Sequence, residues 1–312
     1  MRILVTGALG HIGSQLIRTL PDMIPDAEIT MIDNMLTQRY CSLFNLPEKG
    51  KYRFLEGDVL SWDLDELLDG MHVVIHLAAI TDAANSFDNR DKVDLVNYDS
   101  TERIARACVR KGCKLIFLST TSVYGTQKDE VDENCTVDEL QPQSPYAESK
   151  LKAELMLQSL GKSEGLRFIT LRFGTIFGVS PGMRFHTAVN KFVWQATLGK
   201  PITVWRTAMD QKRPYLDLLD GIRAFRFVIE NSLFDNDVYN VVTVNAAVRE
   251  IVETIHSRIP NLQVELVDAK IMNQLSYNVS RRKFEERGFT FIGDLPKGIY
   301  DTIDTLSAIR TI

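Results

Sequence analysis

Cysteine is scarce in this chain, and the few that are present form no framework. The 312 residues include four cysteines, at Cys41, Cys108, Cys113 and Cys135, and no CxxC pair. This spacing argues against a disulfide scaffold. In a chain of this size it predicts reduced thiols with structural roles, as in a cytosolic protein. We expect no metal site.

Long apolar runs are also missing. The first residues, MRILVTG, lead directly into a predicted strand, without a basic segment followed by an apolar one. We therefore expect no signal peptide, and no segment is apolar for long enough to predict a membrane span. A cytoplasmic protein without a membrane partner is expected.

Basic residues are not in excess. The chain has 36 Lys and Arg against 41 Asp and Glu, a formal net charge of -5. This balance argues against a nucleic-acid partner, because no basic stripe is available to neutralise phosphates. The basic cluster at 281–283 is better explained as the solvated start of a helix. The remaining composition, 45% hydrophobic and 25% charged, is typical of a soluble globular protein.

Short apolar runs alternate with amphipathic segments through the first half of the chain. The apolar runs predict buried strands, and the amphipathic segments predict helices. Buried strands joined by helices require a parallel sheet that is covered on both faces, which is a doubly wound α/β (Rossmann) fold. The expected strands are 3–5, 29–32, 52–55, 73–76, 114–118 and 167–171, and the expected helices are 12–20, 93–110 and 147–160.

Beyond about residue 174 this alternation is interrupted. The expected elements are a loop at 178–182, a helix at 185–198, a strand at 202–205, a helix at 218–230, and strands at 238–242 and 263–267. We predict a doubly wound (Rossmann) domain formed by residues 1–173 and 215–242. A smaller α/β substrate-binding domain is expected to comprise residues 174–214 and 243–312.

Three glycines, Gly7, Gly10 and Gly13, fall between the first predicted strand and the first predicted helix. In a dinucleotide-binding loop the first glycine permits a tight turn and the second lets backbone N–H groups approach a pyrophosphate. The third lets helix and strand pack closely. The helix N-terminus then offers partial positive charge to the phosphates. A glycine-rich loop without a ligand is the alternative, and the position between strand and helix disfavours it.

Asp33 ends the second predicted strand, 20 residues after Gly13. An acid at this position binds the adenosine ribose and repels a 2′-phosphate, so NAD is predicted in preference to NADP. A turn cap is the alternative for Asp33. Asp58, after the third strand, is equally consistent with an adenine contact and with an N-cap. His11, within the glycine loop, is expected to be exposed and not catalytic.

Tyr146 and Lys150 lie four residues apart, so they would share one face of a helix. The pKa of a phenol must fall by about three units from 10, or roughly 4 kcal/mol, before it acts as a base at neutral pH. A neighbouring ammonium and a positive nicotinamide ring together could lower it by that amount. Alone, this pair of residues is common by chance and marks a solvated helix face.

Hydroxyl side chains occupy residues 119–122, at the end of the fifth predicted strand. The carboxyl end of a strand in a doubly wound sheet borders the ligand crevice. One of these hydroxyls could therefore hold a substrate oxygen beside Tyr146. An ordinary polar turn explains the same residues, so no single hydroxyl is selected at this point.

Together these segments resemble those of the extended short-chain dehydrogenases/reductases, in the NAD-dependent sugar-nucleotide epimerase/dehydratase family. The resemblance covers nearly the whole chain and implies bound NAD, a nucleotide-diphosphate sugar substrate, and a homodimer formed through the helices at 93–110 and 147–160. The matching segments are TGALGHIG, Asp33-Asn34, His76-Leu77-Ala78-Ala79, Asn97, STTSVYG, SPYAESK, LRFGTIFG and KRPYLDLLD.

The resemblance also implies roles for individual residues. The implied catalytic residues are Thr120, Tyr146 and Lys150. Tyr146 and Lys150 also contact the cofactor, together with Gly7, Gly10, His11, Ile12, Gly13, Asp33, Asn34, Asp58, Val59, Leu77, Ala78, Ala79 and Asn97. The implied substrate contacts are Thr81, Thr121, Ser122, Thr175, Asn190 and Arg213. Asn190 and Arg213 are assigned to the diphosphate, which an arginine fork suits.

Departures from the family pattern bear on the reaction. Dehydratases of the family usually carry Asp-Glu where this chain has Thr121 and Ser122. At the second of these positions decarboxylases usually carry Glu, and 3,5-epimerases carry Cys. Without an added acid or thiol, oxidation at C4 and return of the hydride remain, so the family pattern implies a 4-epimerase. Thr175 replaces a common asparagine, and residues 180–184 resemble a branch that includes nucleotide-activated heptose 4-dehydrogenases.

Alternatives of two kinds stay open. Among enzymes they are a 4-dehydrogenase, a 4-ketoreductase and a 4,6-dehydratase of a nucleotide-diphosphate sugar. Outside enzymes, a non-catalytic NAD-binding regulator would keep the same fold. Loss of Tyr146 or Lys150 would have indicated a regulator, and both residues are present.

Overall fold

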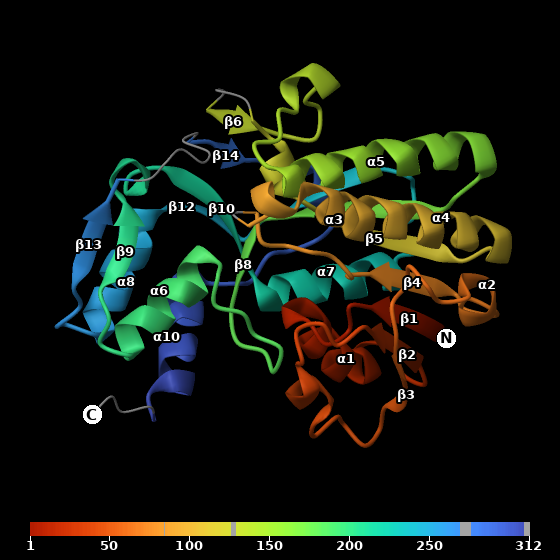
Figure 1. Ribbon diagram of the computed structural model, residues 1–312, viewed down its shortest axis with the longest axis horizontal. Helices are drawn as coiled ribbons and strands as arrows, with labels where there is room; N and C mark the ends of the chain where they lie inside the picture. The colour runs from red at the N-terminus through yellow and green to blue at the C-terminus, as the bar shows by residue number, and fades with distance from the viewer. Residues whose placement is uncertain (84, 126–128, 269–275, 309–312) are drawn as a thin grey trace.

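The computed structural model describes residues 1–83, 85–125, 129–268 and 276–308. Its largest element is a seven-stranded sheet in which every pair of neighbouring strands is parallel (Figure 1). From β1 the chain adds strands first on one side and then, from β4 on, on the other. The predicted doubly wound fold class is confirmed. In spatial order the strands are β11 (Val238–Val241), β7 (Phe168–Phe173), β5 (Lys114–Thr120), β4 (Val73–His76), β1 (Arg2–Thr6), β2 (Glu28–Asp33) and β3 (Lys51–Glu56).

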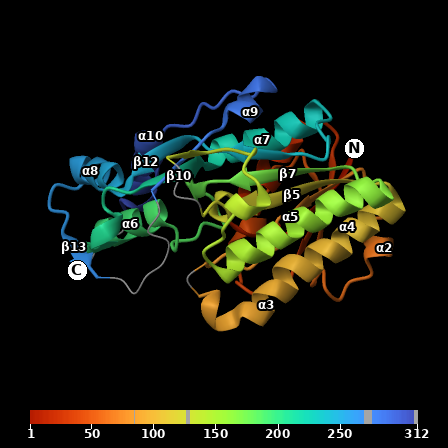
Figure 2. The same ribbon diagram turned by 90° about the horizontal axis from the view of Figure 1, so that it is seen from above.

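Helices cover both faces of this sheet (Figures 1 and 2). One face packs on α1 and α7 through an apolar cluster that includes Leu16 and Phe225. The other packs on α2, α4 and α5 through a cluster that includes Ile104 and Leu157. The helices are α1 (His11–Met23), α2 (Leu64–Leu67), α3 (Arg90–Asp94), α4 (Ser100–Lys111), α5 (Pro145–Glu164), α6 (Ala188–Thr197), α7 (Leu218–Glu230), α8 (Val248–Arg258), α9 (Arg282–Glu286) and α10 (Leu295–Leu306).

A third apolar cluster lies beyond one end of the sheet strands and combines α6, α8 and α10 with short strands, at the left of Figure 1. We propose that it is the core of the smaller substrate-binding domain. The segment that contains α9 contacts β11 of the large sheet instead. The short strands form three small sheets: β8 (Thr175–Phe177), β10 (Lys212–Asp217) and β12 (Val244–Ala247); β9 (Ile202–Trp205) and β13 (Val264–Val267); and β6 (Glu130–Val131) and β14 (Asn278–Val279).

The helix expected at 93–110 is divided in the structure. One π-type turn, Leu95–Asp99, joins α3 to α4. At this turn the fully buried Asn97 accepts the N–H of Ile80 at 2.8 Å and donates to the carbonyl of Ile80 at 2.9 Å. Such turns are frequent at functional sites, and this one holds the chain that follows β4 in place.

Other sequence expectations can be compared directly with the structure. The basic cluster at 281–283 does begin a helix, because Arg281 is the N-cap of α9. All four cysteines have free thiols. Among the described residues, no helix is both long enough and apolar enough to cross a membrane.

Asp220, on α7, joins three distant segments of the chain. Its carboxylate is fully buried and accepts hydrogen bonds from the Thr243 hydroxyl at 2.8 Å and from the backbone N–H groups of Ile292 and Gly293, each at 2.9 Å. Arg223 supplies the balancing positive charge at 3.2 Å. Asp220 thereby ties the segment that leads into α10 to the large sheet.

We expect Asp220→Asn to lower the free energy of unfolding by about 2–4 kcal/mol, because an amide N–H would face backbone N–H donors in a buried site. Urea denaturation measures this change. Asp301→Asn, which removes only an exposed pair with Lys297, is the matched control and should leave the midpoint unchanged. Equal midpoints for Asp220→Asn and the unchanged protein would contradict the stabilising role of the Asp220 hydrogen bonds.

Candidate active site

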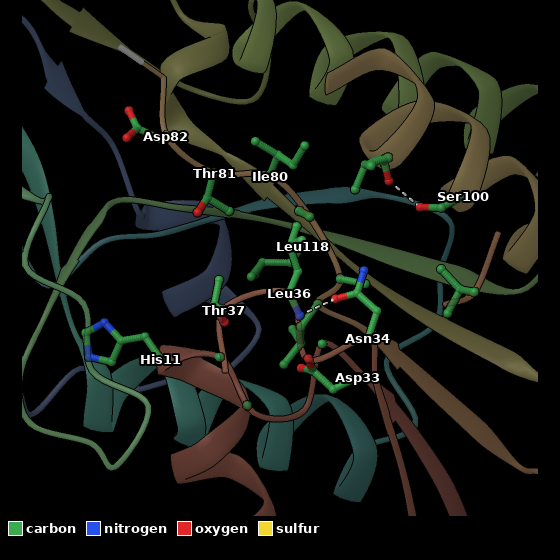
Figure 3. A pocket seen from close by; sticks show the side chains of 18 of the residues that line it. His11, Asp33, Asn34, Leu36, Thr37, Ile80, Thr81, Asp82, Ser100 and Leu118 are labelled. Carbon is green, nitrogen blue, oxygen red and sulfur yellow. Dashed lines mark hydrogen bonds between the residues drawn. The ribbon is translucent and has the colours of Figure 1, made fainter. Parts of the chain in front are cut away.

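A cleft of about 520 Å³ opens at the carboxyl ends of the central strands (Figure 3). It lies beside β1 and β4, where the strand order changes direction, which is where doubly wound sheets bind their ligands. Of the predicted substrate residues, Thr81 lies on its wall. The predicted cofactor residues on the wall are Gly7, Gly10, His11, Ile12, Gly13, Asp33, Asn34, Asp58, Val59, Leu77, Ala78, Ala79, Tyr146 and Lys150.

The glycine loop is shaped by close backbone contacts. Gly7 has a φ of +61°, and a Cβ there would lie 2.7 Å from the backbone nitrogen of Ala78. A Cβ on Gly13 would lie 2.6 Å from the carbonyl oxygens of Gly7 and Ala8. Gly10 is the N-cap of α1, and no side chain caps this helix. The N–H groups of its first turn therefore remain available, which fits a pyrophosphate.

Asp33 lies on the cleft wall at the end of β2 (Figure 3). One carboxylate oxygen accepts the N–H of Leu9 and the other the N–H of Met35, both at 3.0 Å. Asn34 donates to the carboxylate of Asp58 at 3.0 Å. Asp33 therefore caps a turn and also borders the cleft, so the two interpretations of this residue are compatible.

Asp58 also borders the cleft. It caps a turn by accepting the N–H of Leu60 at 2.9 Å, whereas the N-cap of the helix that follows is Asp63. Arg39 lies on the same wall, and one of its nitrogens would be 3.8 Å from a Cβ on Gly10. Sequence analysis missed Arg39, because a single arginine in a polar loop carries no spacing signal.

The predicted exposure of His11 is wrong. The side chain is 3% exposed, and its Nε2 lies 2.9 Å from the carbonyl oxygen of Gly178. Burial lowers the pKa of His11 to about 3, so the ring is neutral. The cause is tertiary, because the segment after β8 folds back on the glycine loop. Gly182 there donates its N–H to the hydroxyl of Ser14 at 2.9 Å.

The three predicted catalytic residues meet between α5 and the end of β5. Tyr146 is in the first turn of α5, and the Thr120 hydroxyl is close enough to favour its phenolate and so lower the pKa of its phenol. Lys150, one turn later, is 3% exposed and donates its Nζ to the carbonyl of Leu118 at 2.9 Å. Tyr146 and Lys150 border the cleft, so a phenol and an ammonium face the same space.

The charges around Tyr146 differ from the expected ones. Burial raises the pKa of the Tyr146 phenol above its usual value, and the Arg184 guanidinium and the Thr120 hydroxyl offset this only in part. Burial lowers the pKa of Lys150 to about 8, and the Glu154 carboxylate opposes that shift. Arg184 is therefore a cation that favours the Tyr146 phenolate, an effect that was not predicted from the sequence.

A buried ion pair supports Lys150 from behind. Glu154, one turn beyond Lys150, accepts hydrogen bonds from Arg172 at 3.0 Å and 2.6 Å, and both side chains are at most 4% exposed. Ser119 donates its hydroxyl to the same carboxylate. Arg172 also donates to the hydroxyl of Tyr124 at 2.9 Å. The pair thus links α5 to β5 and β7 directly behind the catalytic residues.

Two predicted substrate residues near Thr120 do not border the cleft. The hydroxyl of Thr121 donates to the carbonyl of Phe173 at 3.3 Å, and Ser122 donates its N–H to the Thr120 hydroxyl at 3.1 Å. Asn97, predicted as a cofactor contact, lies behind the wall and positions Ile80.

Three further substrate predictions fall outside the cleft wall as described. Thr175 begins β8, beside β10. Asn190, on α6, is fully buried, and its amide donates to the carbonyl of Arg184 at 3.1 Å. Arg213, on β10, lies over the ring of Tyr277 at 5.7 Å. Conversely, Arg184, His186 and Asp82 border the cleft without having been predicted.

Comparison with known proteins agrees with this geometry. Residues 3–241 match the model of the NAD dependent epimerase/dehydratase family. The chain belongs to this family. The predicted family and its cofactor, NAD, are thereby confirmed, and the protein is an enzyme of this family.

Individual relatives resemble the chain over most of its length. It is 30% identical to a trifunctional UDP-glucose 4,6-dehydratase/UDP-4-keto-6-deoxy-D-glucose 3,5-epimerase/UDP-4-keto-L-rhamnose-reductase of Arabidopsis thaliana, over 97% of this chain and 46% of that protein. It is also 30% identical to an uncharacterised UDP-glucose epimerase, YtcB, of Bacillus subtilis, over 77% of this chain and 76% of that one. The chain thus spans about half the length of the plant relative.

The fold is shared with solved structures. A UDP-glucuronic acid 4-epimerase from Bacillus cereus superposes with a TM-score of 0.89 at 24% identity, over 98% of this chain and 99% of that one. At this identity the likeness establishes the fold alone.

We expect Glu154→Gln to move the pKa of Lys150 further below about 8, because the carboxylate favours the ammonium and its removal releases the proton at a lower pH. Titration of the Lys150 Nζ resonance in 15N-lysine-labelled protein measures the shift. Ser119→Ala, which keeps the Glu154 charge, should leave it unchanged. The double variant Glu154→Gln/Arg172→Met removes both charges of the pair and should show a smaller fall, because loss of the Arg172 cation favours the ammonium. An unchanged pKa in Glu154→Gln would contradict the assignment.

Asp33 generates a second expectation for this site. NAD should bind at least about tenfold more tightly than NADP, because a carboxylate at the end of β2 repels a 2′-phosphate. Asp33→Ser should reduce this ratio, whereas Asp58→Asn, at the same end of the cleft, should not. Calorimetric titration with both dinucleotides measures the ratio. Equal affinities in the unchanged protein would remove Asp33 from this role.

Proposed function

We propose that this protein is a NAD-dependent 4-epimerase of a nucleotide-diphosphate sugar, acting through a transient 4-keto sugar. The observation that carries the proposal is that Tyr146 and Lys150 border the cleft together, with the Thr120 hydroxyl acting on the Tyr146 phenol. The two residues after Thr120 add no carboxylate or thiol there. This arrangement supports oxidation and reduction at one carbon.

The cleft residues suit the cofactor of the family. Bound NAD supplies a hydride acceptor for the first half of the reaction and the corresponding donor for the second. In this proposal the first turn of α1 and Gly10 hold the pyrophosphate, and Asp33 holds the adenosine ribose. Lys150 holds the nicotinamide ribose, and with a pKa of about 8 it is mostly protonated at neutral pH.

Tyr146 performs the proton transfer in this proposal. Its phenolate takes the proton of the C4 hydroxyl while the C4 hydrogen leaves as hydride, so that C4 becomes a carbonyl. Thr120 holds the same oxygen by a hydrogen bond. After the sugar has turned over, the hydride returns to the other face of C4 and Tyr146 gives the proton back. Burial raises the pKa of Tyr146, and the positive charge of a bound, oxidised nicotinamide would favour ionisation of the phenol.

A 4,6-dehydratase is the second candidate, favoured by the plant relative, whose name includes this activity. Elimination of water requires a proton donor for the departing hydroxyl. Thr121 and Ser122 offer no carboxyl group, and the hydroxyl of Thr121 is bonded to the backbone of Phe173. Of the carboxylates on the described cleft wall, Asp33 and Asp58 lie at the ends of β2 and β3, so Asp82 is the acid that a dehydratase would use.

A homodimer is part of the same proposal. Helices α4 and α5 pack side by side and form an outer layer of the molecule (Figure 2). Two large apolar residues of this layer remain exposed: Leu95, in the turn that precedes α4, and Leu155, on α5. Pairing of this layer with its symmetry copy would cover them. The predicted cytoplasmic location stays a prediction.

Turnover of the substrate tests the proposal against its rivals. An epimerase re-reduces its own keto intermediate, so we expect no net NADH and a product of unchanged mass, by mass spectrometry and NMR over a panel of nucleotide sugars. Loss of one water would indicate a dehydratase. Net formation or consumption of NADH would indicate a dehydrogenase or a ketoreductase.

Tyr146→Phe should reduce turnover by roughly 10²–10⁴-fold with little change in substrate affinity, because the hydroxyl acts only in the chemical step. Tyr300→Phe, which removes a phenol hydroxyl from α10 in the outlying cluster, is the matched control and should retain full turnover. Near-full activity of Tyr146→Phe would overturn the mechanism.

A further inference from the structure

Arg184 is a buried cation in the cleft wall with an unfilled donor. Its Nη1 donates to the hydroxyl of Thr81, whereas its buried Nε has no hydrogen-bond partner. Among the described residues no carboxylate pairs directly with the Arg184 guanidinium, and Asp82 acts on it only from a distance. A buried guanidinium with an unpaired N–H is costly unless an anion completes it.

Arg184 has charged and titratable neighbours on the cleft wall. Arg39 is a second cation within electrostatic range, and Asp82 is the one carboxylate that acts on Arg184. Burial and the Arg184 charge lower the pKa of His186 to about 4, and His11 is neutral as well. Arg39 has a carboxylate of its own, Asp33. The unpaired Nε of Arg184 is therefore the group that favours an anionic ligand, and the neutral imidazoles do not compete for it.

The position of Arg184 indicates which part of a ligand it meets. Thr81, the hydrogen-bond partner of Arg184, follows β4. The charge of the Arg184 guanidinium acts on the phenol of Tyr146. The cofactor pyrophosphate already has the glycine loop and the first turn of α1. Arg184 therefore lies close to the carbon at which Tyr146 acts, and a sugar carboxylate on C5 is the anionic group adjacent to C4.

We propose that Arg184 binds a carboxylate on the sugar ring, so that the substrate is a nucleotide-diphosphate uronic acid. The inference rests on the proposed function and names the sugar class that it leaves open. A guanidinium edge suits a carboxylate because its two parallel N–H groups match the two oxygens. With Nη1 engaged by Thr81, Nε belongs to the remaining edge. His186 lines the cleft close by and, being neutral, can donate to a sugar hydroxyl.

Binding of matched ligands tests the inference. Nucleotide sugars that differ only in the sugar, UDP-glucuronic acid and UDP-glucose and the corresponding dTDP pair, are titrated into the NAD-bound protein by calorimetry. We expect the uronic acid of at least one pair to bind roughly 10–100-fold more tightly than its neutral counterpart, the range of a charged hydrogen bond. Arg184→Gln should remove this preference, and Arg184→Lys should restore part of it. Lys92→Gln, which removes a different cation from the cleft wall, should leave it unchanged.

The affinity for NAD distinguishes the two anions that Arg184 could bind, a carboxylate of the substrate and a phosphate of the cofactor. It should be unchanged in Arg184→Gln, which also shows that the variant folds. A loss of NAD affinity in Arg184→Gln, with no change in the uronic acid preference, would assign Arg184 to a cofactor phosphate and overturn the inference. Equal binding of uronic and neutral sugars by the unchanged protein, or binding of neither, would overturn it too.

Turnover distinguishes this inference from the proposed function. Suppose that an uncharged nucleotide sugar is epimerised without a change of mass, and that Arg184→Gln has no effect on this reaction. That outcome would reject the carboxylate site and keep the 4-epimerase proposal. A uronic acid converted with net NADH formation, and only while Arg184 is present, would support the carboxylate site and reject the epimerase.

Discussion

The close packing of the glycine loop against its neighbours is the constraint on which the site depends. Gly7 leaves no room for a Cβ beside Ala78, and Gly13 leaves none beside the Gly7 carbonyl. The end of β1, the chain after β4 and the start of α1 can therefore meet at backbone distance. Gly182 seats the segment after β8 on the same loop. The cleft exists because these segments converge where the strand order changes direction.

Burial of charge is the second organising feature. Lys150 loses hydration in the cleft wall, and the Glu154 carboxylate, one turn further along α5 and paired with Arg172, partly compensates. Arg184 loses hydration at the front, with Asp82 as the one carboxylate acting on it. The difference between the two cations has a chemical meaning. A compensated ammonium suits a permanent role in the fold and the cofactor site, whereas an uncompensated guanidinium suits a ligand that comes and goes.

Patterns that depend on local chain geometry were readable from the sequence. The apolar runs predicted the strands of the large sheet, and the glycine spacing predicted its phosphate-facing turn. The four-residue spacing placed Tyr146 and Lys150 on one helix face. Features that depend on contacts between distant segments could not be predicted from the sequence. His11 was predicted to be exposed and is buried by residues near Gly178, 167 positions away in the chain. Arg39 is a single arginine in a loop, and nothing in its spacing marks it. Arg184 ends the segment 180–184, which resembles a branch of the family but was given no role in the site.

The sequence by itself determined the doubly wound fold, the family and its cofactor, because periodicity and motif spacing are properties of contiguous residues. The tertiary structure decided which residues share the cleft. It placed Thr81, Arg184 and Tyr146 around one space, and it set Asn97 behind the wall as a support for Ile80. It also decided the sign of the pKa shift at Tyr146, because burial and charge depend on what folds against a residue and not on what adjoins it in the chain.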